Sequence, residues 1–283
     1  MKTIGVIGAG VIGMGVAQDF AQNGFPVTLI DITDQILDKA KEQIYNYVRF
    51  QALFDKGKTL ENPERVIERI NFTTDYQKLE SVDFVVENVY EKWKTKKELY
   101  EKIDPICLPK CIFMVNTSCI SITKIAALTG RPEKVIGAHF MNPVSMISTI
   151  ELIKGYHTSK ETVDSVSELL SQLQKECIIV NDFPGFVSNR ISHLFINEAA
   201  FVVQDQVACP NEVDNIFKKC FGHKMGPLET ADLIGLDTVV DSLNVLFESY
   251  QDSKFRCCPL LEKMVEAGLL GRKSGQGFYC YPS

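Results

Sequence analysis

The stretch GVIGAGVIGMGVAQ, residues 5–18, is the part of the sequence that decides the fold. Apolar residues 4–7 lead into it, and a helix-compatible segment follows it to Asn23. Its centre is a G-x-G-x-x-G pattern, in which the first glycine permits a tight turn, the second lets a ligand approach the backbone, and the third lets helix and strand pack closely. The turn consists of Gly8, Ala9, Gly10, Val11, Ile12 and Gly13. This pattern predicts a buried strand, a tight turn and a helix in direct succession.

A second apolar segment and an acidic residue extend the pattern. Residues 26–30, PVTLI, read as the next buried strand and are followed by Asp31, 18 residues after Gly13. The helix N-terminus would face phosphates, and a carboxylate at this place accepts hydrogen bonds from ribose hydroxyls and repels a 2′-phosphate. The turn and Asp31 therefore predict a binding site for NAD rather than NADP. A turn of this kind without any nucleotide is the alternative.

Composition describes a globular protein with room for more than one domain. The chain has 283 residues, of which 45% are hydrophobic and 23% charged, and this length suits one large or two ordinary domains. No uncharged apolar run approaches a membrane span, and the first residues read as a strand rather than a signal peptide. We therefore expect a cytoplasmic protein without a membrane partner. The net charge of -6 argues against nonspecific binding to nucleic acid.

The nine cysteines are odd in number and scattered along the chain. Several lie in apolar runs, as Cys177 does in ECIIV, and we interpret them as reduced packing residues. The pairs Cys107/Cys111 and Cys257/Cys258 have no second pair or histidine at ligand spacing. We therefore expect no metal site.

Strand-like and helical segments alternate through the first part of the chain. The expected strands cover residues 3–8, 26–31, 69–73, 82–87, 111–116 and 134–139. Such alternation predicts a doubly wound, mostly parallel α/β sheet of the Rossmann type. The segment at residues 33–67 is longer than one crossover connection between strands needs, and it predicts a protruding pair of antiparallel helices. Two lysines at its tip, Lys56 and Lys58, could bind a substrate phosphate, although a solvated charged tip is the commoner case.

The pattern changes near residues 182–185, where proline and glycine interrupt it. Residues 147–181 predict a strand, a helix and a last strand, whereas NDFPGFVSNR begins a long helix with apolar positions at helical spacing. The remainder looks helical up to a short terminal strand, GFYCY, at 277–281. We therefore expect an NAD-binding Rossmann-type domain at 1–183 and an all-α substrate and dimerisation domain at 184–283.

Polar residues follow the expected strands at the edge where such sheets bind ligands. Glu87 and Glu91 follow the fourth strand, Asn116 and Ser118 the fifth, and His139 and Asn142 the sixth. We assign Asn116 to the cofactor site and Asn142 to the substrate site.

His139 is the candidate general base, since an imidazole titrates near the operating pH of most enzymes. The other three histidines lie in helical or connecting segments. Twelve residues later the apolar strand TIELI carries Glu151, and a half-buried glutamate needs a partner. A hairpin turning near residues 143–145 would bring that carboxylate back to the imidazole. The pair would then act as a base and its orienting group, whereas a satisfied buried histidine is the plainer alternative.

At this point the chain resembles the 3-hydroxyacyl-CoA dehydrogenase family over essentially its full length. The matching segments are the glycine turn with Asp31, NTS, HFMNPV…IEL, PGFVSNR, MGPLE, GLDT and GRKSGQGFY. The resemblance implies that His139 is the catalytic base, that Glu151 is its partner, and that Ser118 and Asn189 contact the hydroxyl and thioester region of the substrate. It also implies that Asp31, Glu91 and Lys96 contact NAD and that the C-terminal domain forms a homodimer.

The chain departs from the usual family pattern beside the expected cleft. It has Ser118-Cys119-Ile120, Met141, Ser145 and Ser148 where the family often has other residues. Several of its motifs look most like a subgroup of polyketide biosynthesis that oxidises glyceryl units on an acyl carrier protein toward hydroxymalonyl-type extender units. We therefore expect a carrier-protein-bound glyceryl thioester as substrate. The alternatives are a 3-hydroxybutyryl-CoA dehydrogenase of fatty-acid or butanoate metabolism and a non-catalytic, crystallin-like NAD-binding protein.

Overall fold

The computed structural model describes residues 1–54 and 61–281, and the side chains of all of these except 51–54. It divides into two compact units, Met1–Asp182 and Phe183–Ser283. Lys56 and Lys58, the two lysines expected at a phosphate, lie outside the described residues.

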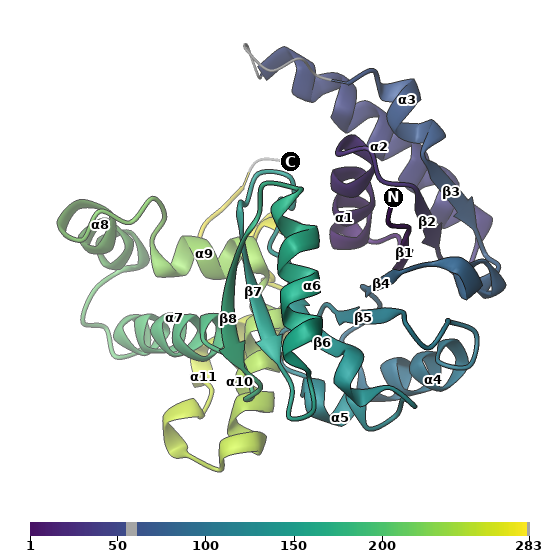
Figure 1. Ribbon diagram of the computed structural model, residues 1–283. Coiled ribbons are helices and arrows are strands. Elements are labelled where there is room, and N and C mark those ends of the chain that lie inside the picture. Colours follow the sequence, from purple (N-terminus) through teal and green to yellow (C-terminus); the bar gives the residue numbers. More distant parts are fainter. Residues whose placement is uncertain (55–60, 282–283) are drawn as a thin grey trace. The chain divides into compact units, whose positions relative to one another are not determined.

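The first unit is built on one sheet of eight strands in the order β3-β2-β1-β4-β5-β6-β7-β8 (Figure 1). All neighbouring strands are parallel except β6 and β7, which form an antiparallel pair. The expected doubly wound, Rossmann-type sheet is confirmed. The strands are β1 (Ile4–Ile7), β2 (Val27–Ile30), β3 (Ile70–Thr73), β4 (Phe84–Glu87), β5 (Ile112–Val115), β6 (Val135–His139), β7 (Thr149–Lys154) and β8 (Glu176–Asn181).

Helices cover both faces of this sheet. One face packs against α1 (Val11–Gln22), α2 (Asp34–Phe54), α3 (Pro63–Glu68) and α6 (Lys160–Ser171), whose buried residues form one apolar cluster with alternate residues of the strands. The other face meets α4 (Trp93–Ile103) and α5 (Ile122–Ala126): Tyr100 packs edge-on against Phe113 of β5, and a Cβ at Gly137 of β6 would lie 2.8 Å from Ile122. This alternation along β5 and β6 explains why the strands are apolar throughout.

The helices α2 and α3 form the expected helical pair (Figure 1). Asn62 caps α3 by accepting a hydrogen bond from the backbone N–H of Glu64, and Pro63 occupies the first turn, where no N–H is needed. The hydroxyl of Tyr45 in α2 donates to Glu64 at 2.8 Å and so links the two helices. On α2, Tyr47 lies 3.1 Å from the hydroxyl of Ser145, in the connection between β6 and β7.

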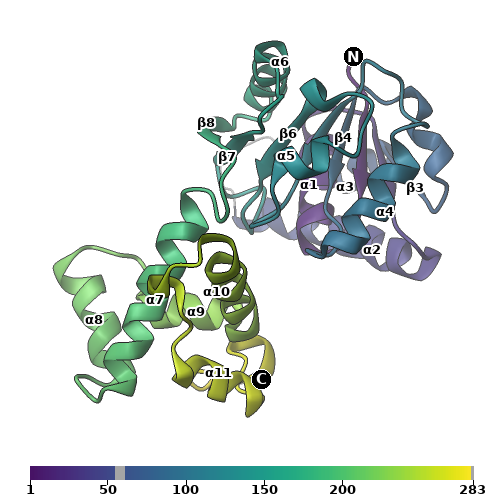
Figure 2. The ribbon, with the colours of Figure 1, turned by 90° about the horizontal axis from the view of Figure 1, so that it is seen from below.

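The second unit is helical. Its central helix α7 (Ser188–Gln204) contacts α9 (Pro227–Ile234), α10 (Leu236–Tyr250) and α11 (Pro259–Glu266), and α8 (Pro210–Cys220) joins α7 to α9 (Figure 2). Their apolar faces enclose a separate core that includes Ile196, Leu243 and Leu261. Within residues 1–54 and 61–281, no helix is both long and apolar enough to cross a membrane.

The expected terminal strand at 277–281 is not a strand. Within this segment, Cys280 forms an isolated bridge with Gln276 and no ladder. The buried carboxylate of Asp232 accepts hydrogen bonds from the backbone N–H groups of Phe278 and Tyr279, at 3.0 and 2.9 Å. Because a side chain takes these two donors, they are not available to a strand ladder.

Candidate active site

Two of the three glycines in the turn are required by the fold, and the third is not. Gly8 has φ +93°, and a Cβ there would lie 2.6 Å from the carbonyl oxygen of Asn88. A Cβ at Gly13 would overlap the carbonyl oxygen of Gly8. Gly10, in contrast, is extended and exposed, and an added Cβ would have nothing within 4 Å. The open backbone at the start of α1 therefore fits the pyrophosphate of a dinucleotide.

Asp31 follows β2 and lies against this turn. One carboxylate oxygen accepts the N–H of Ala9 at 2.6 Å, and the other accepts the N–H of Ile32 at 2.6 Å. Each carboxylate oxygen has further lone pairs, and the side chain is only partly buried. Val11 is exposed beside the turn, while Ile12 packs on the core. The turn and the acidic residue are thus adjacent.

The hairpin predicted from the sequence brings His139 and Glu151 together. They are directly opposed partners in the antiparallel β6–β7 ladder, and their Nδ1 and Oε2 atoms are 3.2 Å apart. The two residues are only 8% and 7% exposed. An ionised carboxylate can only accept, so in a neutral imidazole paired with it Nδ1 carries the proton and Nε2 keeps a lone pair. This is the tautomer that a general base requires.

Ser118 lies on the other side of the imidazole, with its hydroxyl oxygen 3.3 Å from Nε2 of His139. It belongs to the loop that leaves β5, and the backbone N–H of Ser118 donates to Glu91 at 2.8 Å. Asn116 starts the same loop, and its side-chain oxygen accepts the N–H of Phe140 at 3.2 Å. The structure therefore places Ser118, His139 and Glu151 in one hydrogen-bonded row at the carboxyl edge of the sheet.

Lys96, which is expected to contact the cofactor, is buried in this structure. Its side chain is 0% exposed, and its ammonium donates to both carboxylate oxygens of Glu87, at 2.7 and 2.8 Å. Burial raises the pKa of Glu87, and the charge of Lys96 opposes that rise. In this structure the ammonium is engaged with protein acceptors, and its contact with NAD stays a prediction.

The substrate contacts expected of Asn142 and Asn189 stay predictions. Asn142 is exposed in the segment after β6. Asn189 is in α7 of the second unit, where its carbonyl oxygen lies 3.0 Å from Nδ1 of His193.

Sequence reasoning missed a buried lysine that supports the hairpin. Lys175 donates to the carbonyl oxygens of Val144 and Ile147, at 2.5 and 2.8 Å, and lies 3.0 Å from Asp19 of α1. Burial raises the pKa of Asp19, and the nearby Lys175 offsets only part of that rise. The only signal in the sequence is an acidic residue on the apolar side of the first helix, in VAQDFA.

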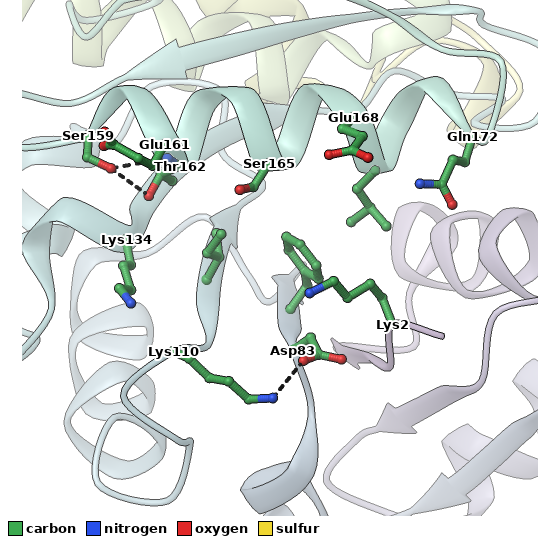
Figure 3. Close-up of a pocket in the computed structure, with 13 residues that line it drawn as sticks. Lys2, Asp83, Lys110, Lys134, Ser159, Glu161, Thr162, Ser165, Glu168 and Gln172 are labelled. Carbon is green, nitrogen blue, oxygen red and sulfur yellow. Dashed lines mark hydrogen bonds and ion pairs between the residues drawn. The ribbon is translucent and has the colours of Figure 1, made fainter.

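A groove of about 340 Å³ lies at the opposite, amino edge of the sheet (Figure 3). Its lysines come from the sheet side and its carboxylates partly from α6 across the groove. The charged lining residues are Lys2, Lys110, Lys134, Asp83, Glu161 and Glu168. The three positive and three negative charges balance, so this groove has no excess charge for a phosphate ligand.

The site contains a base that is oriented by a carboxylate and lies at the edge where a dinucleotide fold holds its ligand. Such a base is suited to take a proton from an alcohol while hydride leaves the same carbon. Fold and site together define the class of NAD-dependent dehydrogenases. Residues 3–183 match the NAD binding domain of 3-hydroxyacyl-CoA dehydrogenase, and residues 185–281 match its C-terminal domain. The chain belongs to the 3-hydroxyacyl-CoA dehydrogenase family.

Individual relatives agree with this family. The chain is 47% identical over 277 residues to a probable 3-hydroxybutyryl-CoA dehydrogenase of Deinococcus radiodurans, covering 98% of this chain and 99% of that protein. It is 41% identical over 279 residues to 3-hydroxybutyryl-CoA dehydrogenase of Clostridioides difficile, covering 98% and 99%. The crystal structure of (S)-3-hydroxybutyryl-CoA dehydrogenase from Ralstonia eutropha superimposes with a TM-score of 0.94 at 39% identity, covering 100% of both chains.

These comparisons confirm the family, the NAD cofactor and the dehydrogenase activity expected from the sequence. They do not support the carrier-protein subgroup, because the relatives above are named for a CoA thioester. The alternative expectation, a 3-hydroxybutyryl-CoA dehydrogenase, agrees better with them.

Proposed function

We propose that this protein oxidises the 3-hydroxyl group of 3-hydroxybutyryl-CoA to give acetoacetyl-CoA, with NAD as the oxidant. The observation that carries the proposal is the row in which His139 lies between Glu151, at 3.2 Å, and Ser118, at 3.3 Å. The printed names of the relatives support the short acyl chain and the CoA carrier.

In the proposed reaction, Nε2 of His139 accepts the proton of the substrate hydroxyl. Ser118 hydrogen bonds to the same hydroxyl and holds it toward Nε2. Glu151 stabilises the imidazolium that forms, since a buried cation needs a nearby anion. NAD held at the glycine turn would supply the acceptor for the hydride that leaves C3. For the reverse reduction, the same imidazolium returns its proton to the oxygen.

The remaining site residues complete this proposal. Gly8, Gly10, Gly13 and the start of α1 would hold the pyrophosphate, and Asp31 the adenosine ribose. Asn116 would border the cofactor, while Asn142 and Asn189 would contact the substrate near its thioester. Lys56 and Lys58 stay predicted partners for a phosphate of CoA.

A homodimer through residues 184–283 is also part of the proposal. Large apolar side chains of this unit are exposed, among them Ile191, Val207, Ile216 and Phe221. Exposed apolar surface of this kind is typical of an interface. Light scattering with the intact protein would give twice the 31.8 kDa chain mass if the proposal is right, and a monomer would contradict it.

The substrate is tested by measuring NADH formation with 3-hydroxybutyryl-CoA, with glyceryl-CoA and with glyceryl loaded on an acyl carrier protein. We expect the highest kcat/KM with 3-hydroxybutyryl-CoA. A higher value with the loaded carrier protein would replace the proposal by the polyketide one. An absence of turnover with every thioester, together with tight NADH binding, would indicate a non-catalytic binding protein.

The role of His139 is tested with His139→Gln, for which we expect kcat to fall about 10²-fold or more, the usual size of a general-base contribution. The dissociation constant for NADH should stay nearly unchanged. His157→Gln is the matched control, because His157 is exposed in a turn outside the row. Wild-type turnover by His139→Gln would remove this residue from the mechanism.

A further inference from the structure

The turn that leads into α7 has an uncommon backbone conformation. Gly185 has φ +75°, and the next residue, Phe186, has φ +49°. Positive φ suits glycine, but a side chain in this region crowds the backbone, so Phe186 keeps it only because its surroundings impose it. Phe186 is buried, and a Cβ at Gly185 would lie 2.6 Å from Leu246 of α10. Contact with α10 therefore helps to impose a strained turn.

Tyr250 is the last residue of α10, which lies beside α7 (Figure 2). Its hydroxyl donates to the carbonyl oxygen of Pro184 at 3.0 Å. The guanidinium carbon of Arg190 lies 4.6 Å from the centre of the Tyr250 ring, which is a cation–π distance. The ring also stacks on the buried Phe255, with the two centroids 5.0 Å apart. Tyr250 therefore contacts both the residue before the strained turn and a residue in the first turn of α7.

The first turn of α7 carries Asn189, the residue expected to contact the substrate near its thioester. Val187 occupies the N-cap position of this helix, and its apolar side chain has no oxygen that could cap it. The backbone N–H of Arg190 donates instead to the carbonyl oxygen of Gly185, at 2.9 Å. The direction in which α7 starts, and with it the position of Asn189, therefore depends on the turn at 184–186.

We propose that Tyr250 is a positioning residue, which holds the turn at 184–186 and thereby directs Asn189 toward the substrate. The inference rests on the function proposed above, in which Asn189 contacts the substrate near its thioester. Two interactions carry it, the hydrogen bond to Pro184 and the cation–π contact with Arg190. The turn, α7 and α10 all belong to the second unit, whereas the NAD binding domain is matched by residues 3–183. The affinity for NADH should therefore not depend on Tyr250.

Two variants of Tyr250 remove these interactions in turn. Tyr250→Phe removes only the hydroxyl and keeps the ring for Arg190, whereas Tyr250→Leu removes both. Tyr279→Phe is the matched control in the same unit, because the hydroxyl of Tyr279 bonds to α8, at 3.0 Å from the carbonyl oxygen of Pro210 and 2.8 Å from the carboxylate of Asp214. The control removes at least as much hydrogen bonding as Tyr250→Phe, so it separates positioning from a general loss of stability.

The main measurement is kcat/KM for acetoacetyl-CoA reduction at saturating NADH. Tyr250→Phe should lower it about two- to tenfold, because one neutral hydrogen bond shifts the equilibrium between two conformations by about that factor. Tyr250→Leu should lower it by about a further two- to fivefold, since the cation–π contact is lost as well. The dissociation constant of NADH, measured by fluorescence, should change less than about twofold in both variants. Tyr279→Phe should leave both quantities within about twofold of wild type.

A double-mutant cycle with Asn189→Ala tests whether Tyr250 acts through Asn189. If it does, Tyr250→Phe should have almost no further effect on kcat/KM once residue 189 is alanine. Losses that multiply in the double variant would overturn the inference, because the two residues would then act independently. A weaker NADH affinity in Tyr250→Phe would overturn it as well, since Tyr250 would then influence the cofactor.

Amide hydrogen exchange of residues 186 and 190 reports on the turn without any substrate. Their N–H groups donate to the carbonyl oxygens of Phe183, at 2.8 Å, and Gly185, at 2.9 Å. Tyr250→Phe should accelerate this exchange about two- to tenfold, and Tyr279→Phe should not. Unchanged exchange in Tyr250→Phe would mean that other groups hold the turn, which contradicts the inference. If the wild-type protein turns over no thioester, the proposed function fails together with the role of Asn189, and the exchange measurement still decides whether Tyr250 holds the turn.

Discussion

Gly10→Ala is expected to weaken NAD binding without unfolding the protein. Gly10 has φ -72°, which alanine adopts readily, and its added Cβ would have nothing within 4 Å. Alanine gains about 0.4–1 kcal/mol through the unfolded chain and loses a few tenths of a kcal/mol or more as a poorer N-cap than glycine. The two effects nearly cancel, so the melting temperature should shift by less than about 2 °C for a protein of this size.

The same methyl group would occupy the side from which a pyrophosphate approaches the backbone. Losing one hydrogen bond to a charged group costs about 1.5–3 kcal/mol, which corresponds to NADH binding about 10- to 100-fold weaker. Fluorescence titration with NADH and a thermal melt are the assays. Gly13→Ala is the comparison, because its methyl group would overlap the backbone of Gly8 and should lower the melting temperature strongly. Wild-type NADH affinity in Gly10→Ala would refute the reasoning.

Three further variants test separate features. Asp31→Ala should improve NADPH binding relative to NADH about tenfold or more, because a repulsion to the 2′-phosphate disappears; an unchanged affinity ratio would exclude Asp31 as the ribose contact. Lys175→Met leaves the carboxylate of Asp19 buried without its partner and should cost about 3–5 kcal/mol in urea unfolding, whereas a loss below about 1 kcal/mol would mean that the pair is hydrated. The carboxylate of Glu61 is hydrogen-bonded to Arg69, and this bond lowers the pKa of Glu61 below the ordinary 4.5. The carboxylate therefore stabilises the fold above pH 4.5, and this stabilisation is lost as the pH falls through the lowered pKa. Glu61→Gln should therefore melt earlier than wild type at pH 7, by an amount equivalent to about 1 kcal/mol or less, and the melting temperatures of the two proteins should converge as the pH falls below the lowered pKa of Glu61.

The parts of the molecule that follow from short-range patterns could be predicted from the sequence. The strand–turn–helix at residues 4–22 depends on glycine spacing and apolar periodicity, which adjacent residues determine. The β6–β7 hairpin followed from one acidic residue in an apolar strand, since a buried carboxylate requires a partner and His139 was the nearest candidate.

The parts that depend on tertiary packing could not be predicted in this way. Glu91 bonds to a loop 26 to 28 residues away, and that distance closes only because α4 returns the chain to the next strand. Lys96 looks like any helical lysine in KWKTKKE, and only its packing shows that it is enclosed. The aromatic residues of the terminal segment favour a strand, whereas the carboxylate of Asp232, which is distant in sequence, accepts hydrogen bonds from two of its backbone N–H groups.

The opposed placement of His139 and Glu151 in the β6–β7 ladder has a consequence for protein engineering. Their separation derives from the spacing between antiparallel neighbours, about 4.5–5.5 Å between Cβ atoms, and both strands are held on their outer sides by β5 and β8. The geometry of the pair therefore depends on the register of these two strands. Two strands and a turn form a transferable unit, and a histidine and a glutamate at opposed positions would reproduce this proton-accepting pair in another antiparallel sheet.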